Sequence, residues 1–292
     1  MGNNQGNRCL PIEGTRRRVE FEDNWFAEGR SRRAYRGTYH GDRRVEGNKC
    51  VVKLYKQEWC DRMGELAYRA DIRASERAQE MAMAFKQKYP TIESIEFVQP
   101  EISKIDHSSA FKLLGFIPIH KRVKGKTTET KVTSKVMIPT GSTVAVERYL
   151  EGEFIRFLSN TGYQGEEVLD TLPSAFSHFT FHISNGQILV CDLKGLRWEH
   201  GYVFTDPAIH SQTAGDRPNY FGPTDLGVLG MIKFFQNHRC NELCEGFLKP
   251  DLVNIRPRHT SRARRITDRP ESTYMQELER HSPVGFELLS SS

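Results

Sequence analysis

The sequence contains no run of about 18 apolar residues, so nothing in it predicts a helix that spans a membrane. Its first residues are polar and lack the apolar segment of a signal peptide, which argues against export. Only six cysteines occur in 292 residues. Without a signal peptide, that content favours reduced thiols over a disulfide framework. We therefore expect a cytoplasmic protein with no membrane span.

The sequence also lacks a concentrated basic stripe with interleaved aromatic residues, the usual mark of a nucleic-acid-binding surface. The formal net charge of +5 is mild for this length. Arginines gather at 30–36 and at 256–269, and the first group lies beside Gly29, where a phosphate-facing loop explains it better. We expect no nucleic-acid partner, and a zinc-dependent nucleic-acid adaptor is the least favoured hypothesis.

Three widespread motifs of phosphate chemistry are absent: Gly-x-x-x-x-Gly-Lys-Ser/Thr, His-Arg-Asp and Asp-Phe-Gly. Their absence argues against a P-loop protein and against a protein kinase of the common type. Any phosphate chemistry must therefore use other residues.

The length is sufficient for two lobes around a cleft, and the mixture of strand and helix patterns predicts an α+β fold. A boundary is expected near residue 150, because an apolar strand is followed there by Gly152. The last residues are basic and rich in Arg, Ser and Pro, which predicts disorder. The predicted segments are a flexible tail (1–14), a compact domain (15–252) with an N-lobe (about 15–150) and a C-lobe (about 151–252), and a largely disordered basic tail (253–292).

The stretch 49–55 predicts a strand in which a lysine stands among apolar residues. A buried ammonium group is unfavourable unless it meets an anion, so Lys53 is a candidate for binding phosphate. The alternative is an edge strand on which Lys53 points to water. A helix is predicted over 71–88, where Gly and Pro are absent.

Two aspartates follow in the second half of the chain. The apolar run 188–191 predicts a buried strand that ends directly at Asp192, and Asp206 comes after a further loop. Either acid alone could be a turn or helix-cap residue. Together with Lys53 and the loop at Gly29, they supply what phosphoryl transfer requires: donors around the phosphates, and carboxylates for magnesium and for the attacking hydroxyl.

His238, Cys240 and Cys244 could supply three of the four ligands of a structural zinc. On a regular helix the two cysteines would share a face but His238 would not, so the backbone must break if all three bind one metal. Candidates for the fourth ligand are His178, His210 and Cys191. The alternative is two buried cysteines that behave as small apolar side chains beside an unrelated histidine.

Several short motifs between about residues 20 and 252 occur together in one known family. In chain order they are Phe26-Ala27-x-Gly29-x-x-Arg32-x-x-Tyr35-Arg36, Val52-Lys53-Leu54-Tyr55, Glu147-x-Tyr149-Leu150-x-Gly152-x-Phe154, Ala175-Phe176-Ser177-His178-Phe179-Thr180-Phe181, Asp192-Leu193-x-Gly195, Thr205-Asp206-Pro207-x-Ile209-His210, Phe221-Gly222-x-x-x-Leu226-Gly227 and His238-x-Cys240-Asn241-x-x-Cys244. On these motifs the chain resembles the alpha-kinases, the atypical protein kinases that include myosin heavy chain kinase, elongation factor 2 kinase and the channel-kinases. The resemblance implies a two-lobed kinase-like fold with a zinc-stabilised C-lobe. It also implies an ATP-dependent kinase for serine and threonine residues of protein substrates.

The resemblance further implies a role for each nucleotide-binding residue. Lys53 would contact the ATP phosphates, and the loop from Gly29 to Arg36 would cover them, with Arg32 as a contact. Glu147 and Leu150 would belong to the hinge that meets adenine, chiefly through backbone groups.

For the chemistry, the resemblance implies that Asp192 accepts the proton and that Asp206 binds Mg²⁺. Gly222 and Gly227 would bracket a loop for the peptide substrate. His210 would then be structural. The implied Zn²⁺ ligands are His178, His238, Cys240 and Cys244.

Lys194 departs from the family pattern, which usually has a metal-binding Gln two residues after the first of the two aspartates. An ammonium group cannot ligate magnesium and would repel it. It would instead neutralise phosphate or pair with a nearby acid. The loop between Asp192 and Asp206 is also long. These features favour an alternative function, a pseudokinase or ATP-binding scaffold with impaired catalysis.

Overall fold

The computed structural model describes residues 7–64, 66–107, 111–113, 117–119, 140–165, 170–213, 220–252, 256–257, 284–285 and 288–289. The chain divides into two compact units. The first consists of Met1–Ile72 and Val98–Glu151, and the second of Arg73–Phe97 and Gly152–Ser292. Helix α2 (Leu66–Lys88) contributes residues to both units.

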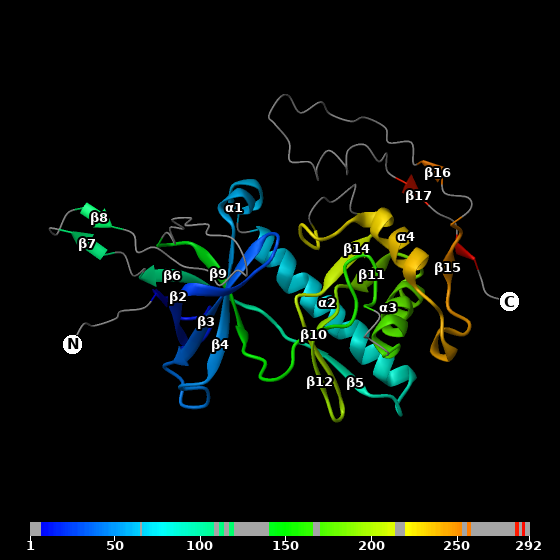
Figure 1. The fold of residues 1–292 in the computed structure, drawn as a ribbon, viewed down its shortest axis with the longest axis horizontal. Helices are drawn as coiled ribbons and strands as arrows, with labels where there is room; N and C mark the ends of the chain where they lie inside the picture. Colours follow the sequence, from blue (N-terminus) through cyan, green and yellow to red (C-terminus); the bar gives the residue numbers. More distant parts are fainter. Residues whose placement is uncertain are drawn as a thin grey trace. The chain divides into compact units, whose positions relative to one another are not determined.

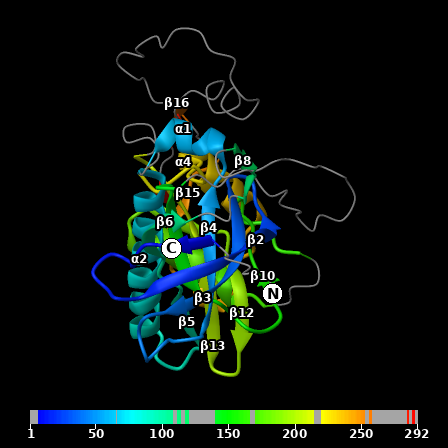
Figure 2. The same cartoon turned by 90° about the vertical axis from the view of Figure 1, so that its left-hand side faces the viewer.

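The first unit is built on a closed barrel of six strands in the order β1-β2-β3-β4-β9-β6 (Figure 1). All neighbouring pairs are antiparallel, and β1 closes the barrel by pairing with both β2 and β6. Figure 2 shows β2, β3 and β4 side by side. The elements are β1 (Asn7–Cys9), β2 (Arg18–Glu28), β3 (Arg32–His40), β4 (Lys49–Tyr55), α1 (Gln57–Met63), β6 (Glu101–His107), β7 (Phe111–Leu113), β8 (Ile117–Ile119) and β9 (Thr143–Arg148).

Buried and exposed side chains alternate along the barrel strands, and the buried ones form the core of the first unit. On β2, Val19 and Phe21 are buried while Glu20 and Glu22 are exposed, as expected for a strand with one face on a core. On β4, Val52 and Leu54 belong to the same core. The period of two therefore places Lys53 on the opposite face of β4.

The second unit contains a four-stranded sheet in the order β10-β12-β13-β5 and a two-stranded pair, β11-β14. Helix α3 begins with Pro173 in its first turn, and Pro173 to Phe181 are all buried, which makes it the central helix of this unit. The elements are β5 (Ser94–Phe97), β10 (Ile155–Arg156), α3 (Leu172–Ile183), β11 (Ile188–Cys191), β12 (Lys194–Trp198), β13 (Gly201–Thr205), β14 (Ala208–Ser211), α4 (Gly227–Asn237), the 3₁₀ turn η1 (Glu242–Cys244), β15 (Lys249–Pro250), β16 (Arg256–Pro257), β17 (Val284–Gly285) and β18 (Leu288–Leu289).

The N-terminal boundary differs from the prediction of a flexible tail over 1–14. Asn7–Cys9 forms β1, with Cys9 buried and the Asn7 amide donating to the carbonyl of Glu22. A strand of three residues is too short to give a periodic signal, so sequence reasoning missed it. Residues 1–6 lie outside the described residues.

The boundary between the units also differs from the predicted one. The chain does divide after Glu151, next to the expected position, but residues 73–97 belong to the second unit rather than to the N-lobe. The reason is packing: Phe85 of α2 contacts Phe176 and Phe179 of α3 at ring-centroid distances of 5.6 and 4.9 Å. In addition, β5 pairs in parallel with β13.

Most of the basic tail, 253–292, lies outside the described residues. Its described parts are strands β16, β17 and β18, of which β16 pairs with β17 and β18 pairs with β15. Within the described part of the chain, no helix combines the length and the apolar character needed to cross a membrane.

Candidate functional site

Lys53 is paired with a carboxylate inside the first unit. Its Nζ atom lies 2.7 Å from Oε2 of Glu147, and the two side chains are only 8% and 5% exposed. The register of β4 and β9 opposes Val51 to Glu147 and Lys53 to Ala145, so the two charged residues are diagonal neighbours on one face. The edge-strand alternative for Lys53 is therefore wrong.

Glu147 is expected to meet adenine chiefly through backbone groups, and its side chain pairs with Lys53. The pair therefore leaves the predicted backbone contact possible. Leu150 lies two residues beyond the end of β9 and is half-buried.

Arg32 is the first residue of β3, directly after a tight turn in which the Gly29 N–H donates to the Arg32 carbonyl at 2.9 Å. The expected loop from Gly29 to Arg36 is therefore a short turn followed by the first residues of β3. The Arg32 guanidinium is held by Asp71 of α2, with 2.8 Å between Nη1 and Oδ2. The Tyr55 hydroxyl donates to the same carboxylate. Asp71 is therefore a positioning residue that sequence reasoning missed.

Asp192 and Asp206 both lie where a buried strand of the second unit ends. Asp192 follows β11 and Asp206 follows β13, and their φ angles are 54° and 50°. Over the described ranges, Asn185 is the only other non-glycine residue with positive φ, and it lies in a turn. Non-glycine residues with positive φ are uncommon, and strained backbone of this kind clusters at active and ligand-binding sites.

The segment between the two aspartates is a hairpin, β12-β13, rather than the predicted loop. Its strands are short, and it contains Gly195 at a position that only glycine fits. A Cβ atom there would lie 2.0 Å from the Val203 carbonyl oxygen. Because β13 also pairs with β5, this hairpin is part of a sheet that no local pattern could reveal.

Lys194, the first residue of β12, pairs with Asp192 as one of the predicted alternatives stated. Its Nζ atom lies 2.5 Å from Oδ2 of Asp192 and 3.3 Å from the backbone carbonyl oxygen of Asp206. One ammonium group therefore contacts both candidate catalytic positions.

The candidate substrate loop between Gly222 and Gly227 is anchored by the buried His210 and the half-buried Asp225. Burial lowers the pKa of His210, and the neutral ring bonds on both sides: Nδ1 accepts from the Leu226 N–H at 3.1 Å, and Nε2 donates to the Asn160 carbonyl at 2.6 Å. Asp225 accepts from the Ser211 hydroxyl at 2.7 Å and from the Gly227 N–H at 2.8 Å. His210 is thus structural and is excluded as a zinc ligand.

We expect Gly230→Ala to destabilise this region. Gly230 lies in α4, where alanine would normally stabilise the helix by up to about 1 kcal/mol. Its Cβ, however, would lie 2.5 Å from the His210 ring, which is buried and bonded at both nitrogens. Overpacking of this kind costs about 1–3 kcal/mol, so a net loss should appear in urea unfolding. Gly165→Ala is the control, because among the described residues no atom apart from those of its chain neighbours lies within 4 Å of its Cβ. An unchanged stability of Gly230→Ala would show that His210 can shift.

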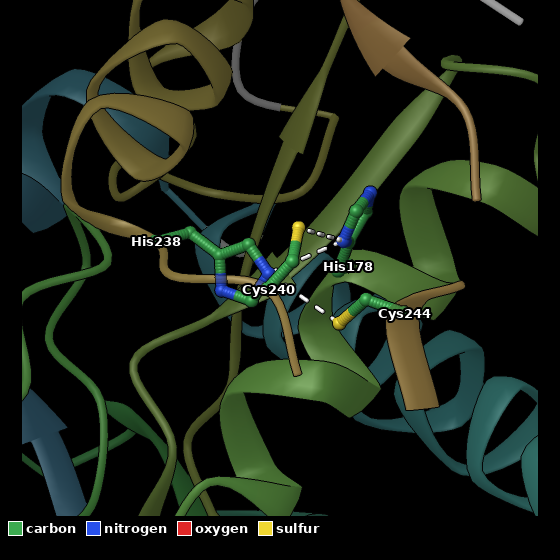
Figure 3. A group of neighbouring side chains, drawn as sticks. All are labelled: His178, His238, Cys240 and Cys244. Carbon is green, nitrogen blue, oxygen red and sulfur yellow. Dashed lines mark hydrogen bonds between the residues drawn. The ribbon is translucent and has the colours of Figure 1, made fainter. Parts of the chain in front are cut away.

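The four predicted zinc ligands lie together in the second unit (Figure 3). The ligand atoms are all within 4.8 Å of one another. His178 Nδ1 is 3.2 Å from His238 Nε2 and 3.7 Å from Cys240 Sγ, while Cys244 Sγ is 3.5 Å from His238 Nε2. A tetrahedral zinc with bonds of about 2.0 Å to nitrogen and about 2.3 Å to sulfur needs ligand atoms about 3.3–3.8 Å apart.

The surroundings of the histidines also fit a bound cation. The outer nitrogens bond to protein: His178 Nε2 to the Leu248 carbonyl at 2.9 Å and His238 Nδ1 to the Ser174 hydroxyl at 2.7 Å. With each ring donating its outer N–H, the inner nitrogens face each other with lone pairs, as zinc-binding histidines do. Burial lowers the pKa of His178 to about 4 and that of His238 to about 3, so both rings are neutral.

The thiol of Cys244 needs a cation to act as a ligand, because burial raises its pKa to about 11. A coordinating metal ion deprotonates a thiol outright. The predicted break in the helix is present: α4 ends at Asn237, and His238 is extended with ψ of 130°. The two cysteines, in contrast, do not share one helix face, since only Cys244 lies in the short turn η1.

Sequence reasoning missed several partners of the site residues, and some of them left a signal. Glu147 directly follows the apolar run 144–146, a position as unusual for an acid as that of Lys53 is for a lysine, and this could have indicated a pair. Asp71 and Asp225 lie in ordinary helix and loop contexts, where nothing distinguishes them from solvated acids. All six cysteines carry free thiols, and Cys191, one of the possible fourth zinc ligands, is buried in β11.

Comparison with known structures gives a likeness across most of the chain. The alpha-kinase domain of myosin heavy chain kinase A in complex with AMP matches with a TM-score of 0.57 and 27% identity, covering 78% of this chain and 89% of that one. The domain of myosin-II heavy chain kinase A with AMP-PNP matches with a TM-score of 0.59 and 24% identity, covering 84% and 95%.

Relatives by sequence are longer proteins. Eukaryotic elongation factor 2 kinase of Homo sapiens is 43% identical over 100 residues, which is 34% of this chain and 13% of that protein. Alpha-protein kinase 1 of Dictyostelium discoideum is 32% identical over 234 residues, or 80% of this chain and 14% of that protein. The matches thus span less than a fifth of these relatives.

The model of the alpha-kinase family matches residues 27–244, the range that holds every motif residue described above except Phe26. That range includes the Lys53–Glu147 pair, both strained aspartates and all four ligand atoms of the histidine–cysteine cluster. The chain therefore belongs to the alpha-kinase family.

Proposed function

We propose that this chain is the catalytic domain of an alpha-type protein kinase that transfers the γ-phosphoryl group of ATP to serine or threonine residues of proteins. The observation that carries the proposal is the pair Asp192 and Asp206, both strained and both at the ends of buried strands. Membership of the family supports it, as do the nucleotide complexes of the related domains.

In this proposal the hydroxyl oxygen of the substrate forms a bond to the γ-phosphorus, the bond from that phosphorus to the bridging oxygen of ADP breaks, and the hydroxyl proton passes to Asp192. Lys53, oriented by Glu147, binds the ATP phosphates, and the turn at Gly29 and Arg32 covers them. Mg²⁺, held by Asp206, would neutralise charge on the phosphates.

Zinc has a different part in the proposal. Bound by His178, His238, Cys240 and Cys244, it would connect α3 to the segment after α4 and so stabilise the second unit. The loop from Gly222 to Gly227 would receive the peptide. We further propose a cytoplasmic location, since six free cysteines without a disulfide are typical of a reducing compartment.

The test is a phosphorylation assay with γ-labelled ATP, Mg²⁺ and a serine/threonine peptide library. We expect label on the peptides, and a loss of about 10²–10⁴-fold for Asp192→Asn and for Asp206→Asn. Asn is chosen because it tolerates positive φ. Glu199→Gln, at the exposed turn of the same hairpin, is the control. Full activity of Asp206→Asn would contradict its assigned role.

A pseudokinase is the second candidate, and the 2.5 Å contact between Lys194 and Asp192 favours it. It predicts binding of ATP without transfer of label. Lys194→Gln should then raise incorporation strongly, whereas an active kinase should incorporate label with Lys194 in place.

A further inference from the structure

The Asp192 carboxylate has a cation on each of its oxygens. Lys194 Nζ lies 2.5 Å from Oδ2, and Arg156 Nε lies 3.7 Å from Oδ1. The pairing of β10 with β12 opposes Arg156 to Lys194, so the two cations are cross-strand neighbours. Asp192, which directly follows the buried strand β11, is one carboxylate beside two cations, so the three groups together carry a net positive charge.

The two cations differ in how firmly they are held. Arg156 is 64% exposed, so it can turn into solvent, whereas Lys194 and Asp192 are only 17% and 15% exposed. Lys194 also donates to the Asp206 carbonyl at 3.3 Å. Its ammonium group is thus fixed between Asp192 and Asp206, and a divalent ion that approached Asp192 would have to displace it or stay close to a like charge.

We propose that the Lys194 ammonium group occupies the position beside the Asp192 carboxylate and so excludes divalent metal ions from this carboxylate. The consequence for catalysis, which rests on the proposed kinase function, is that Asp192 takes no part in holding Mg²⁺ and that any protein ligand for Mg²⁺ is supplied elsewhere. Lys194 is therefore a positioning residue whose fixed charge takes the place of a metal ion.

The test measures metal binding without nucleotide. The full chain, loaded with zinc so that the histidine–cysteine cluster is filled, is titrated with Mn²⁺ and followed by electron paramagnetic resonance. We expect the native chain, Lys194→Arg and Arg156→Gln to bind no more Mn²⁺ than Asp192→Asn does. We expect Lys194→Gln to gain a Mn²⁺ site that is at least tenfold tighter than any Mn²⁺ binding by the native chain. The double variant Asp192→Asn with Lys194→Gln should lose this site.

Two results would overturn the proposal: a native Mn²⁺ site that Asp192→Asn abolishes, or no gain in a folded Lys194→Gln protein. Circular dichroism checks the fold of each variant. If Lys194→Gln does not fold, Lys194→Met replaces it in the Mn²⁺ titration. Because no nucleotide is present, a failure of the proposed kinase function would leave this measurement unchanged, and the two can be distinguished.

Discussion

Chelation of zinc is expected to unfold the second unit. The segment from His238 to Cys244 has no helix or strand apart from η1, and the metal would tie it to the central helix α3 through His178. Without a cation, an imidazole nitrogen of the buried His178 would face one of the half-buried His238 at 3.2 Å. Structural zinc contributes about 10–16 kcal/mol of apparent binding energy in small peptides. That is comparable with the whole stability of a typical domain, about 5–15 kcal/mol.

The measurement is thermal unfolding with and without a strong chelator, together with metal analysis for one zinc per chain. His178→Ala and Cys244→Ser should resemble the chelated protein. Cys60→Ser is the matched control, because Cys60 lies outside the cluster and a serine hydroxyl can still donate to the Tyr55 carbonyl. A melting temperature that does not respond to chelation would disprove a structural role for zinc.

Lys53→Met is expected to abolish phosphoryl transfer and also to destabilise the first unit. The destabilisation is expected because the substitution leaves Glu147 buried without the ammonium group 2.7 Å away. Removing one partner of a buried ion pair typically costs about 3–5 kcal/mol.

Urea unfolding of single and double variants separates the two effects. Lys53→Met with Glu147→Gln should recover most of the lost stability, since no buried charge then lacks its partner, but it should not recover activity. The control is Lys49→Met on the same strand: its pair with Glu151 is 66% and 70% exposed, so we expect little change. Equal stability of Lys53→Met and the native chain would show that Glu147 finds another partner.

The candidate site could be predicted from the sequence wherever its signal was local. Four apolar residues in a row identified β11 and so gave Asp192 its position at the end of a strand. The spacing of His238, Cys240 and Cys244 indicated a metal site and required a break in the helix, which the structure contains. The apolar residues on both sides of Lys53 made this lysine unusual, because a charge stood inside an otherwise apolar strand.

Partners distant in sequence could not be predicted in the same way. Spacing left His178, His210 and Cys191 equally possible as the fourth ligand, and only the resemblance chose among them. In the structure His178 Nδ1 faces His238, 60 residues away, whereas His210 bonds to Asn160 and Leu226. The chain has no local feature that separates one buried histidine from another, because the difference lies in which element packs beside it.

The amino-acid sequence by itself determined the family, the strands that carry Lys53 and Asp192, and three of the four residues of the histidine–cysteine cluster, since each signal is a motif within about one turn or strand. Only the tertiary structure decided that Glu147 holds Lys53 across 94 residues and that residues 73–97 belong to the second unit. It also decided that the expected loop after Asp192 is a hairpin whose Lys194 contacts both aspartate positions. Such pairings arise from the register of strands and the packing of helices, which many distant residues set together.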